Sequence, residues 1–158
     1  MRALLMAAML TAPLAAEARQ MRPAIDLTGA WVGFADDVTV SEPLFGGAVR
    51  WPLTPRLSIG PEVVYIQGDN HDHLVVTGNL VFDFRPNQPL QPFVVAGGGM
   101  FRTREEFFDD AVTSAEGAFT AGGGVRARIS DRVSVGVDAR IGWELHVRIG
   151  GLVAIQLR

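Results

Sequence analysis

The segment from Val133 to Trp143 alternates apolar and polar residues with little interruption. Its odd positions are valine, alanine, isoleucine or tryptophan, and its even positions include Ser134, Asp138 and Arg140. Because successive side chains of a β-strand point to opposite faces, this pattern predicts a strand with one apolar and one polar face. The same pattern recurs along the chain, with few helix-favouring runs. It predicts an all-β protein.

Eight segments have strand patterns bounded by turn residues. They cover residues 27–35, 44–53, 57–67, 73–85, 90–102, 117–129, 132–143 and 147–157. Short turns alternate with longer acidic connections at 36–43, 68–72 and 103–116. Short turns at one end and long loops at the other are typical of outer-membrane barrels. The sequence predicts an eight-stranded antiparallel up-and-down transmembrane β-barrel over residues 26–158.

The start of the chain predicts export. Arg2 precedes an apolar run over 3–12, and residues 16–18 have the small-x-small form of a cleavage site. We expect a cleaved secretory signal peptide at 1–18 and a short periplasmic segment at 19–25. The apolar run is shorter than the roughly 20 residues that a helix needs to cross a bilayer. Any membrane-spanning role must therefore use strands.

Composition limits the remaining possibilities. A chain of 158 residues is long enough for one domain. A net charge of −3 without a basic stripe argues against nucleic acid as a partner. The absence of cysteine excludes disulfides and thiolate metal sites. All 14 basic residues are arginine, whose planar guanidinium pairs with carboxylates through two hydrogen bonds.

The apolar faces are predicted to contact lipid, including Phe93, Val95 and Phe101 of the fifth strand. Aromatic residues then form two belts at the membrane interfaces. The belt near the short turns contains Trp51, Phe82, Phe84 and Phe93, and the belt near the long loops contains Phe45, Tyr65, Phe101, Phe119 and Trp143. The facing of the first strand stays open because both its faces are mostly apolar. Pro61 interrupts a strand and predicts a bulge or a shifted register.

The polar faces bring charges of both signs into the barrel. The inward residues are Arg50, Glu62, Asp83, Arg102, Arg126, Arg128, Asp138, Arg140, Glu144 and Arg148. The interior of an eight-stranded barrel is only wide enough to be filled by side chains. We therefore predict a structural network of lumen ion pairs formed by Arg50, Glu62, Asp83, Arg126, Arg128, Asp138, Arg140 and Arg148. A narrow proton or ion path is the alternative, but the cost of an unpaired buried charge favours a structural network.

One cluster has metal-ligating residue types. His71 and His73 are two residues apart in a predicted strand and are flanked by Asp69 and Asp72. Residues at this spacing share a face, so the two imidazoles and a carboxylate could hold Zn²⁺ or Cu²⁺. A solvated loop tip explains the same residues, and we favour it. No cofactor is predicted.

Two other segments were candidates for activity. The loop over 102–110 mixes paired charges with two phenylalanines, which suits a surface ligand, Ca²⁺ through oxygen ligands, or a solvated loop whose phenylalanines rest at the membrane interface. His146 lies near Glu144, as in a serine-type site. However, Ser134 is too far along its strand and Ser114 lies in another loop, so no enzyme is predicted.

Three segments carry a resemblance to a known group. Residues 54–62, 91–99 and 121–130 resemble turn-then-strand segments of small outer-membrane β-barrels of Gram-negative bacteria, which include the OmpA transmembrane domain, OmpX-like proteins and opacity-type proteins. The resemblance implies location in the outer membrane, contact with its lipids and lipopolysaccharide, and insertion by the barrel-assembly machinery. Members commonly end on an aromatic residue, whereas this sequence ends with Leu157 and Arg158.

These observations favour a barrel without an open pore that has a structural role in the envelope and an interaction role at its surface loops. The first alternative is a secreted periplasmic soluble β-barrel that binds an apolar ligand. Dense charge on the polar faces would favour that alternative, but glycine, alanine, serine and threonine dominate them. A lipid-A-modifying barrel enzyme is the least favoured alternative.

Overall fold

The computed structural model describes residues 21–34, 40–68, 71–107, 110–142 and 146–158, with the backbone alone for 34, 40, 41, 71, 103–107 and 110–115. These residues form eight strands, as the sequence predicted. The strands are β1 (Ala24–Phe34), β2 (Val40–Pro52), β3 (Leu57–Gln67), β4 (His71–Asp83), β5 (Leu90–Phe107), β6 (Asp110–Arg128), β7 (Val133–Gly142) and β8 (His146–Gln156). The bounds of β3 are those predicted, and β1 begins three residues earlier than expected.

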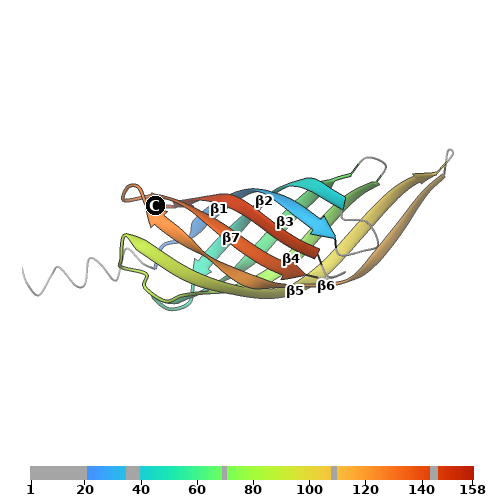
Figure 1. Ribbon diagram of the computed structural model, residues 1–158. Coiled ribbons are helices and arrows are strands. Elements are labelled where there is room, and N and C mark those ends of the chain that lie inside the picture. The colour runs from blue at the N-terminus through green and yellow to red at the C-terminus, as the bar shows by residue number, and fades with distance from the viewer. Residues whose placement is uncertain (1–20, 35–39, 69–70, 108–109, 143–145) are drawn as a thin grey trace, which may run out of the picture.

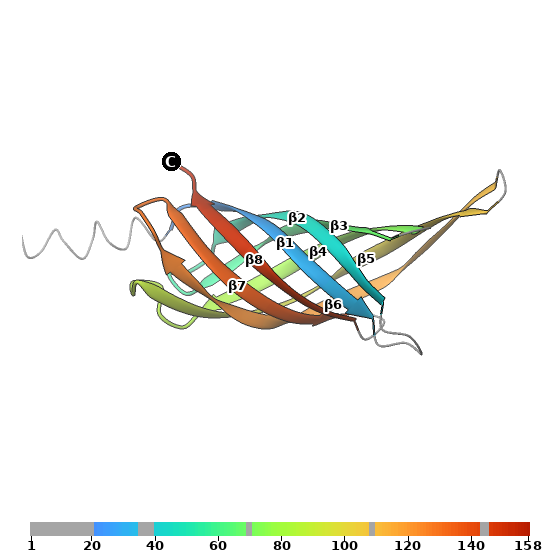
Figure 2. The same cartoon turned by 45° about the horizontal axis from the view of Figure 1, so that its top comes forward.

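The eight strands close into one antiparallel barrel (Figures 1 and 2). Each strand pairs with the next along the chain, and β8 pairs with β1 from Gln156 opposite Ala24 to His146 opposite Phe34. Because the barrel is closed, the backbone N–H and C=O groups of each strand pair with those of its neighbours. A protein that crosses a bilayer with strands needs this pairing, since the hydrocarbon core offers no water to bind them. The predicted all-β, eight-stranded up-and-down barrel is confirmed. None of the described residues forms a helix that could cross a membrane.

The two ends of the barrel differ in their connections. The turn end carries the short connections 53–56, 84–89 and 129–132, and the chain leaves β8 there. At the opposite end, called the loop end, β5 and β6 project well beyond the other strands (Figures 1 and 2). This corrects the predicted loop over 103–116, because the β5–β6 ladder continues until Phe107 lies opposite Asp110.

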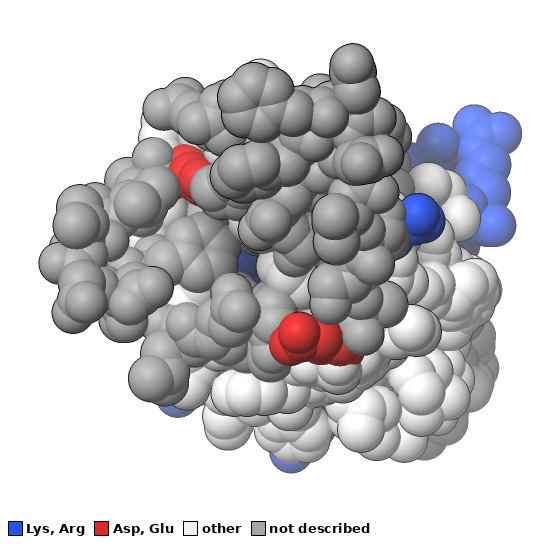
Figure 3. Space-filling model, turned by 90° about the vertical axis from the view of Figure 1, so that its right-hand side faces the viewer, with Lys and Arg blue, Asp and Glu red and all other residues white. Residues whose placement is uncertain are grey.

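The outer wall is apolar. Exposed large hydrophobic residues follow the outward positions of all eight strands, among them Leu27, Phe45, Val63, Leu80, Val94, Phe119, Val137 and Ile149. Seen from the loop end, the described part of the wall is mainly uncharged (Figure 3). Trp51 and Phe84 are exposed near the turn end, and Phe45 and Tyr65 are exposed nearer the loop end. This wall suits contact with hydrocarbon, flanked by aromatic side chains at both interfaces.

The structure decides the facing of β1, which the sequence left open. Thr28, Ala30 and Val32 are buried in the lumen, whereas Leu27 and Trp31 are exposed on the wall. The inward set of β1 therefore begins at the buried Ala24 and includes Asp26, which lies opposite Ala48 of β2.

The predicted facing of β5 is wrong. Phe93, Val95 and Phe101 are buried inside the barrel, and Val94 and Met100 face outward. Directly opposed residues of antiparallel strands share a face, and Phe93 lies opposite the inward Asp83. Arg102, predicted inward, is exposed for the same reason. Phe93 and Phe101 therefore do not belong to the aromatic belts in which the sequence placed them.

Two apolar clusters fill part of the lumen. One contains Ala30, Val32, Leu44, Val64 and Ile66, and the other contains Val81, Phe93, Val95, Leu152 and Ala154. Both clusters lie beside charged side chains, so the described part of the lumen is packed with side chains.

Pro61 does not shift the register of its strand. Ala48 lies opposite Glu62 and Trp51 lies opposite Ile59, so β2 and β3 keep one register on both sides of the proline. The neighbouring Gly60 allows the strands to approach closely there, because a Cβ atom at this position would overlap the carbonyl oxygen of Val49. The predicted bulge or register shift is therefore wrong.

Candidate functional site

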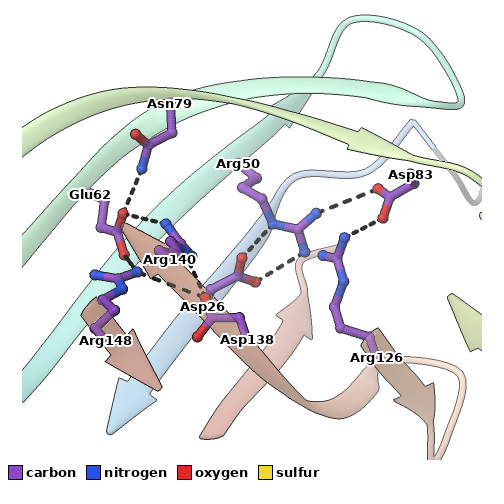
Figure 4. Close-up of polar contacts among 9 residues, drawn as sticks. All are labelled: Asp26, Arg50, Glu62, Asn79, Asp83, Arg126, Asp138, Arg140 and Arg148. Carbon is purple, nitrogen blue, oxygen red and sulfur yellow. Dashed lines mark hydrogen bonds and ion pairs between the residues drawn. The ribbon is translucent and has the colours of Figure 1, made fainter. Parts of the chain in front are cut away.

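The middle of the lumen is built around Glu62, which is only 3% exposed. Arg148 Nη2 donates to its Oε1 at 2.6 Å, and Arg140 Nη1 donates to its Oε2 at 2.9 Å. Asn79 Nδ2 donates to the same Oε2 at 2.5 Å. Donors from β4, β7 and β8 thus converge on one carboxylate of β3 (Figure 4).

Asp138 completes this middle cluster, which we define as Glu62, Asn79, Asp138, Arg140 and Arg148. Arg140 Nε donates to Asp138 Oδ2 at 2.7 Å, and Arg148 Nη2 lies 3.8 Å from the same oxygen. Asp138 and Arg140 are two residues apart on β7 and therefore share its inward face. The two carboxylates and two guanidiniums have a net charge of zero. A buried ionic cluster needs this neutrality, because an unpaired buried charge is costly.

A second group, the mouth cluster, lies nearer the turn end and consists of Asp26, Arg50, Asp83 and Arg126 (Figure 4). Arg50 donates two hydrogen bonds to the Asp26 carboxylate, from Nε at 2.5 Å and from Nη2 at 3.0 Å. Asp83 accepts from Arg126 and also lies 4.0 Å from Arg50 Nη1. The Arg126 guanidinium stands 4.3 Å above the centre of the Phe93 ring, a cation–π contact.

The structure brings seven of the eight predicted network residues into these two clusters. Arg128 is the exception and is a correction: it is exposed near the turn end, where its Nη2 donates to the Pro86 carbonyl at 2.8 Å. Alternation indicates which face of a strand a residue lies on, but it does not indicate where the strand ends. β6 ends at Arg128, so this side chain lies at the end of the barrel. Glu144 lies outside the described residues.

Sequence reasoning missed two members of the clusters, Asp26 and Asn79. Asp26 was missed because the facing of β1 was undecided, although its alternation with the small polar Thr28 was a usable signal. Asn79 shares the inward face of β4 with Asp83, but its uncharged amide gives no charge signal in the sequence.

The cavities inside the barrel are unequal. A vestibule of about 440 Å³ opens at the turn end, with the mouth cluster at its inner limit. Two further cavities of about 20 Å³ each lie along the lumen, beside Glu62. Each of these spaces holds no more than a water molecule, so the described side chains leave no wide passage beside the middle cluster.

The predicted metal-ligating residues do not form one site in the described part of the chain. His73 is buried in the lumen and stacks on Phe101 with ring centres 4.9 Å apart, whereas Asp72 is exposed on the opposite face of β4. Asp69 and the side chain of His71 lie outside the described residues. Among the described side chains no group of three potential ligands occurs.

Serine and histidine side chains lie far apart. The described serine side chains, Ser58, Ser130 and Ser134, lie at the turn end, and all three line the vestibule. His73 and His146 lie at the loop end of β4 and β8. A serine nucleophile needs its base within hydrogen-bond reach, which this separation prevents for these described residues. Ser114 is described by its backbone alone.

Comparison with known proteins accords with this geometry. The family model described as the outer membrane protein beta-barrel domain matches residues 2–150. The chain belongs to this family. A search of curated protein sequences finds no match.

Solved structures share the fold of this outer-membrane barrel family member at low sequence identity. Neisserial surface protein A matches with a TM-score of 0.76 and 8% identity over 85% of this chain and 97% of that one. The N-terminal β-barrel domain of Pseudomonas aeruginosa OprF matches with a TM-score of 0.67 and 14% identity over 85% and 97%. The outer membrane enzyme PagL matches with a TM-score of 0.54 and 18% identity over 84% and 99%. At these identities the likeness shows the fold alone.

Proposed function

We propose that this protein is a barrel of the Gram-negative outer membrane that has a structural role in the envelope and presents the β5–β6 hairpin at the cell surface, without an open pore. The observation that carries the proposal is the middle cluster, in which Glu62 joins β3 to β4, β7 and β8 across the lumen. Such a cross-link rigidifies the barrel and blocks its axis at the same time.

The outer wall supports the membrane part of this proposal. Apolar side chains face outward on every strand, and the described ion pairs lie inside. A water-soluble barrel that binds an apolar ligand would need the reverse arrangement or a large apolar cavity. The vestibule at the turn end is lined by five arginines instead.

The β5–β6 hairpin supports the surface role. Its ladder continues past the ends of β4 and β7, since β4 begins at His71 opposite Glu105 and β7 ends at Gly142 opposite Thr120. One edge of β6 between Asp110 and Phe119 therefore has no strand beside it among the described residues. An unpaired edge is a surface on which an extended segment of another protein can add as a strand.

The same geometry supports the proposal that the protein contacts lipid and lipopolysaccharide. Arg102 is exposed on the outer face of β5, next along that face from the exposed Met100 toward the loop end. A guanidinium at that height suits the phosphate groups of an outer-leaflet lipid. We also propose the barrel-assembly machinery as the partner that inserts the barrel.

Fractionation combined with gel mobility tests this proposal. We expect the protein to leave the membrane fraction only in detergent and to migrate faster when unheated than when heated, as a compact barrel does. In planar bilayers we expect no stepwise conductance from the same preparation. Recovery in a detergent-free periplasmic extract would contradict the membrane role, and regular conductance steps would contradict the closed lumen.

A further inference from the structure

The turn end of the barrel is strongly basic. Its exposed arginines come from the segment before β1, the three short turns, the last residue of β6 and the C-terminal residue. They are Arg22, Arg56, Arg85, Arg128, Arg132 and Arg158. Asp131 is the acidic residue exposed beside them in the described part of this end. Within the lumen, by contrast, the two clusters are each balanced. The excess positive charge of the described barrel is therefore concentrated at the turn end.

Part of this excess lines the vestibule. Five arginines border the 440 Å³ cavity: Arg22, Arg128 and Arg132 at its rim, and Arg50 and Arg126 at its floor. The acidic residues that line it are Asp83 and Asp131. Arginine keeps its charge at every physiological pH. Asp83 already pairs with Arg50 and Arg126, so it does not neutralise the arginines of the rim.

The vestibule also has the polar lining of a binding site. Asn87, Gln91 and Gln156 border it together with the arginines. Arg126, 3% exposed, retains a buried Nε–H for which the described protein offers no acceptor. Its neighbours hold it in place, because Asp83 accepts from one Nη and Phe93 packs against the guanidinium face. A volume of about 440 Å³ falls within the range of small-molecule sites.

We propose that the vestibule binds a small water-soluble polyanion from the periplasmic side, one that carries phosphate or clustered carboxylate groups and at least two negative charges. Guanidinium groups recognise both of these oxyanions through paired hydrogen bonds. A cationic cleft with low-dielectric walls raises the local concentration of such anions. Since the middle cluster closes the lumen beyond the vestibule, the anion binds and leaves by the same mouth.

The experiment uses the full barrel in a non-ionic, phosphate-free detergent and titrates inorganic pyrophosphate by calorimetry. We expect one site per barrel, weakened as NaCl rises from about 50 to about 300 mM because salt screens exposed charges. Arg132→Gln removes a rim charge and should weaken binding roughly three- to tenfold. Asp131→Asn removes the opposing rim charge and should tighten binding.

Arg56→Gln and Arg85→Gln are the matched controls. Both arginines are exposed at the same end, but neither lines the cavity. We expect each control to bind pyrophosphate within about twofold of the unmodified protein, because screened charges outside the site contribute little. Each variant is first shown to migrate as a folded barrel when unheated, which separates loss of the site from loss of the barrel.

Three outcomes would overturn the proposal. The first is no binding by the unmodified protein at about 10 mM pyrophosphate, far above the Kd expected for several paired hydrogen bonds. The second is an equal loss in Arg56→Gln and Arg132→Gln, which would make the whole rim a non-specific basic surface. The third is displacement of pyrophosphate by a short-chain phosphatidylglycerol, which would identify the anion as a lipid headgroup.

Discussion

The lumen and the wall of this barrel use the same alternating strands in opposite ways. Along β7, Asp138 and Arg140 point inward and pair, while Val137 and Ile141 point outward and remain exposed. In the lumen a charge is tolerated as long as its partner is present, and on the wall a charge meets hydrocarbon. Whether the barrel tolerates a charged residue is therefore decided by which of two adjacent positions it occupies.

Both in the lumen and on the wall, the distance of a residue from water depends on its depth along the barrel. The middle cluster is more buried than the mouth cluster: the side chain of Glu62 is 3% exposed, whereas those of Arg50 and Asp26 are 13% and 15% exposed. On the wall, the centre of the bilayer is farther from water than the interfaces. The comparison thus predicts a large effect at the middle of each surface and a small one at its end.

Replacement of Glu62 should have the largest effect. Glu62→Leu removes the acceptor of Arg140, Arg148 and Asn79 and leaves a buried positive charge in excess. We expect the free energy of unfolding to fall by about 3–5 kcal/mol. Denaturant unfolding in phospholipid vesicles measures this change.

A double variant provides the control for that prediction. Glu62→Leu combined with Arg148→Met leaves Arg140 with Asp138, so the cluster is again neutral. We expect the double variant to lose less stability than Glu62→Leu alone. An equal or greater loss would mean that packing, and not the stranded charge, causes the effect.

A charge placed at the middle of the wall should have the next largest effect. Val137 is 57% exposed and lies between Val125 and Gly151 on the neighbouring strands. Val137→Arg should cost about 2–4 kcal/mol of stability in the membrane. The heat-dependent gel shift after insertion into vesicles reports this loss, with Val137→Leu as the apolar control. Normal insertion of the arginine variant would contradict the assignment of this face to lipid.

The mouth cluster should respond less than the middle cluster. Asp26→Ala removes both hydrogen bonds to Arg50, but Arg50 keeps Asp83 at 4.0 Å and borders the open vestibule. We expect a loss of about 1–3 kcal/mol in denaturant unfolding. A loss as large as that of Glu62→Leu would show that the vestibule does not hydrate the freed guanidinium.

A charge at the end of the wall should have the smallest effect. Ile129 is 65% exposed and directly follows β6 at the turn end, where headgroups and water are within reach. Ile129→Arg should cost about 0–1 kcal/mol, because the penalty for arginine falls toward the interface. Denaturant unfolding in phospholipid vesicles, applied to this variant and to Val137→Arg, measures the two costs. Similar costs for the two variants would contradict the depth gradient.

The facing of β7 and β8 was predictable because one face of each strand carries charge. Asp138, Arg140 and Arg148 all point inward, where the alternation had placed them. In β5 the alternation carried no such information, since residues 93–96 are apolar on both faces and three glycines follow. The facing of β5 follows from its register with β4, where Phe93 lies opposite Asp83.

The sequence by itself determined the number of strands, their antiparallel order and the apolar wall, because a period of two and the spacing of turn residues are properties of the local chain. It also determined which charges were available to the lumen. Only the tertiary structure decided the facing of β1 and β5, the continuation of the β5–β6 hairpin and the division of the charges into a middle and a mouth cluster. These depend on how residues distant along the chain come to lie opposite one another, and that is settled only when the barrel closes and its register is set.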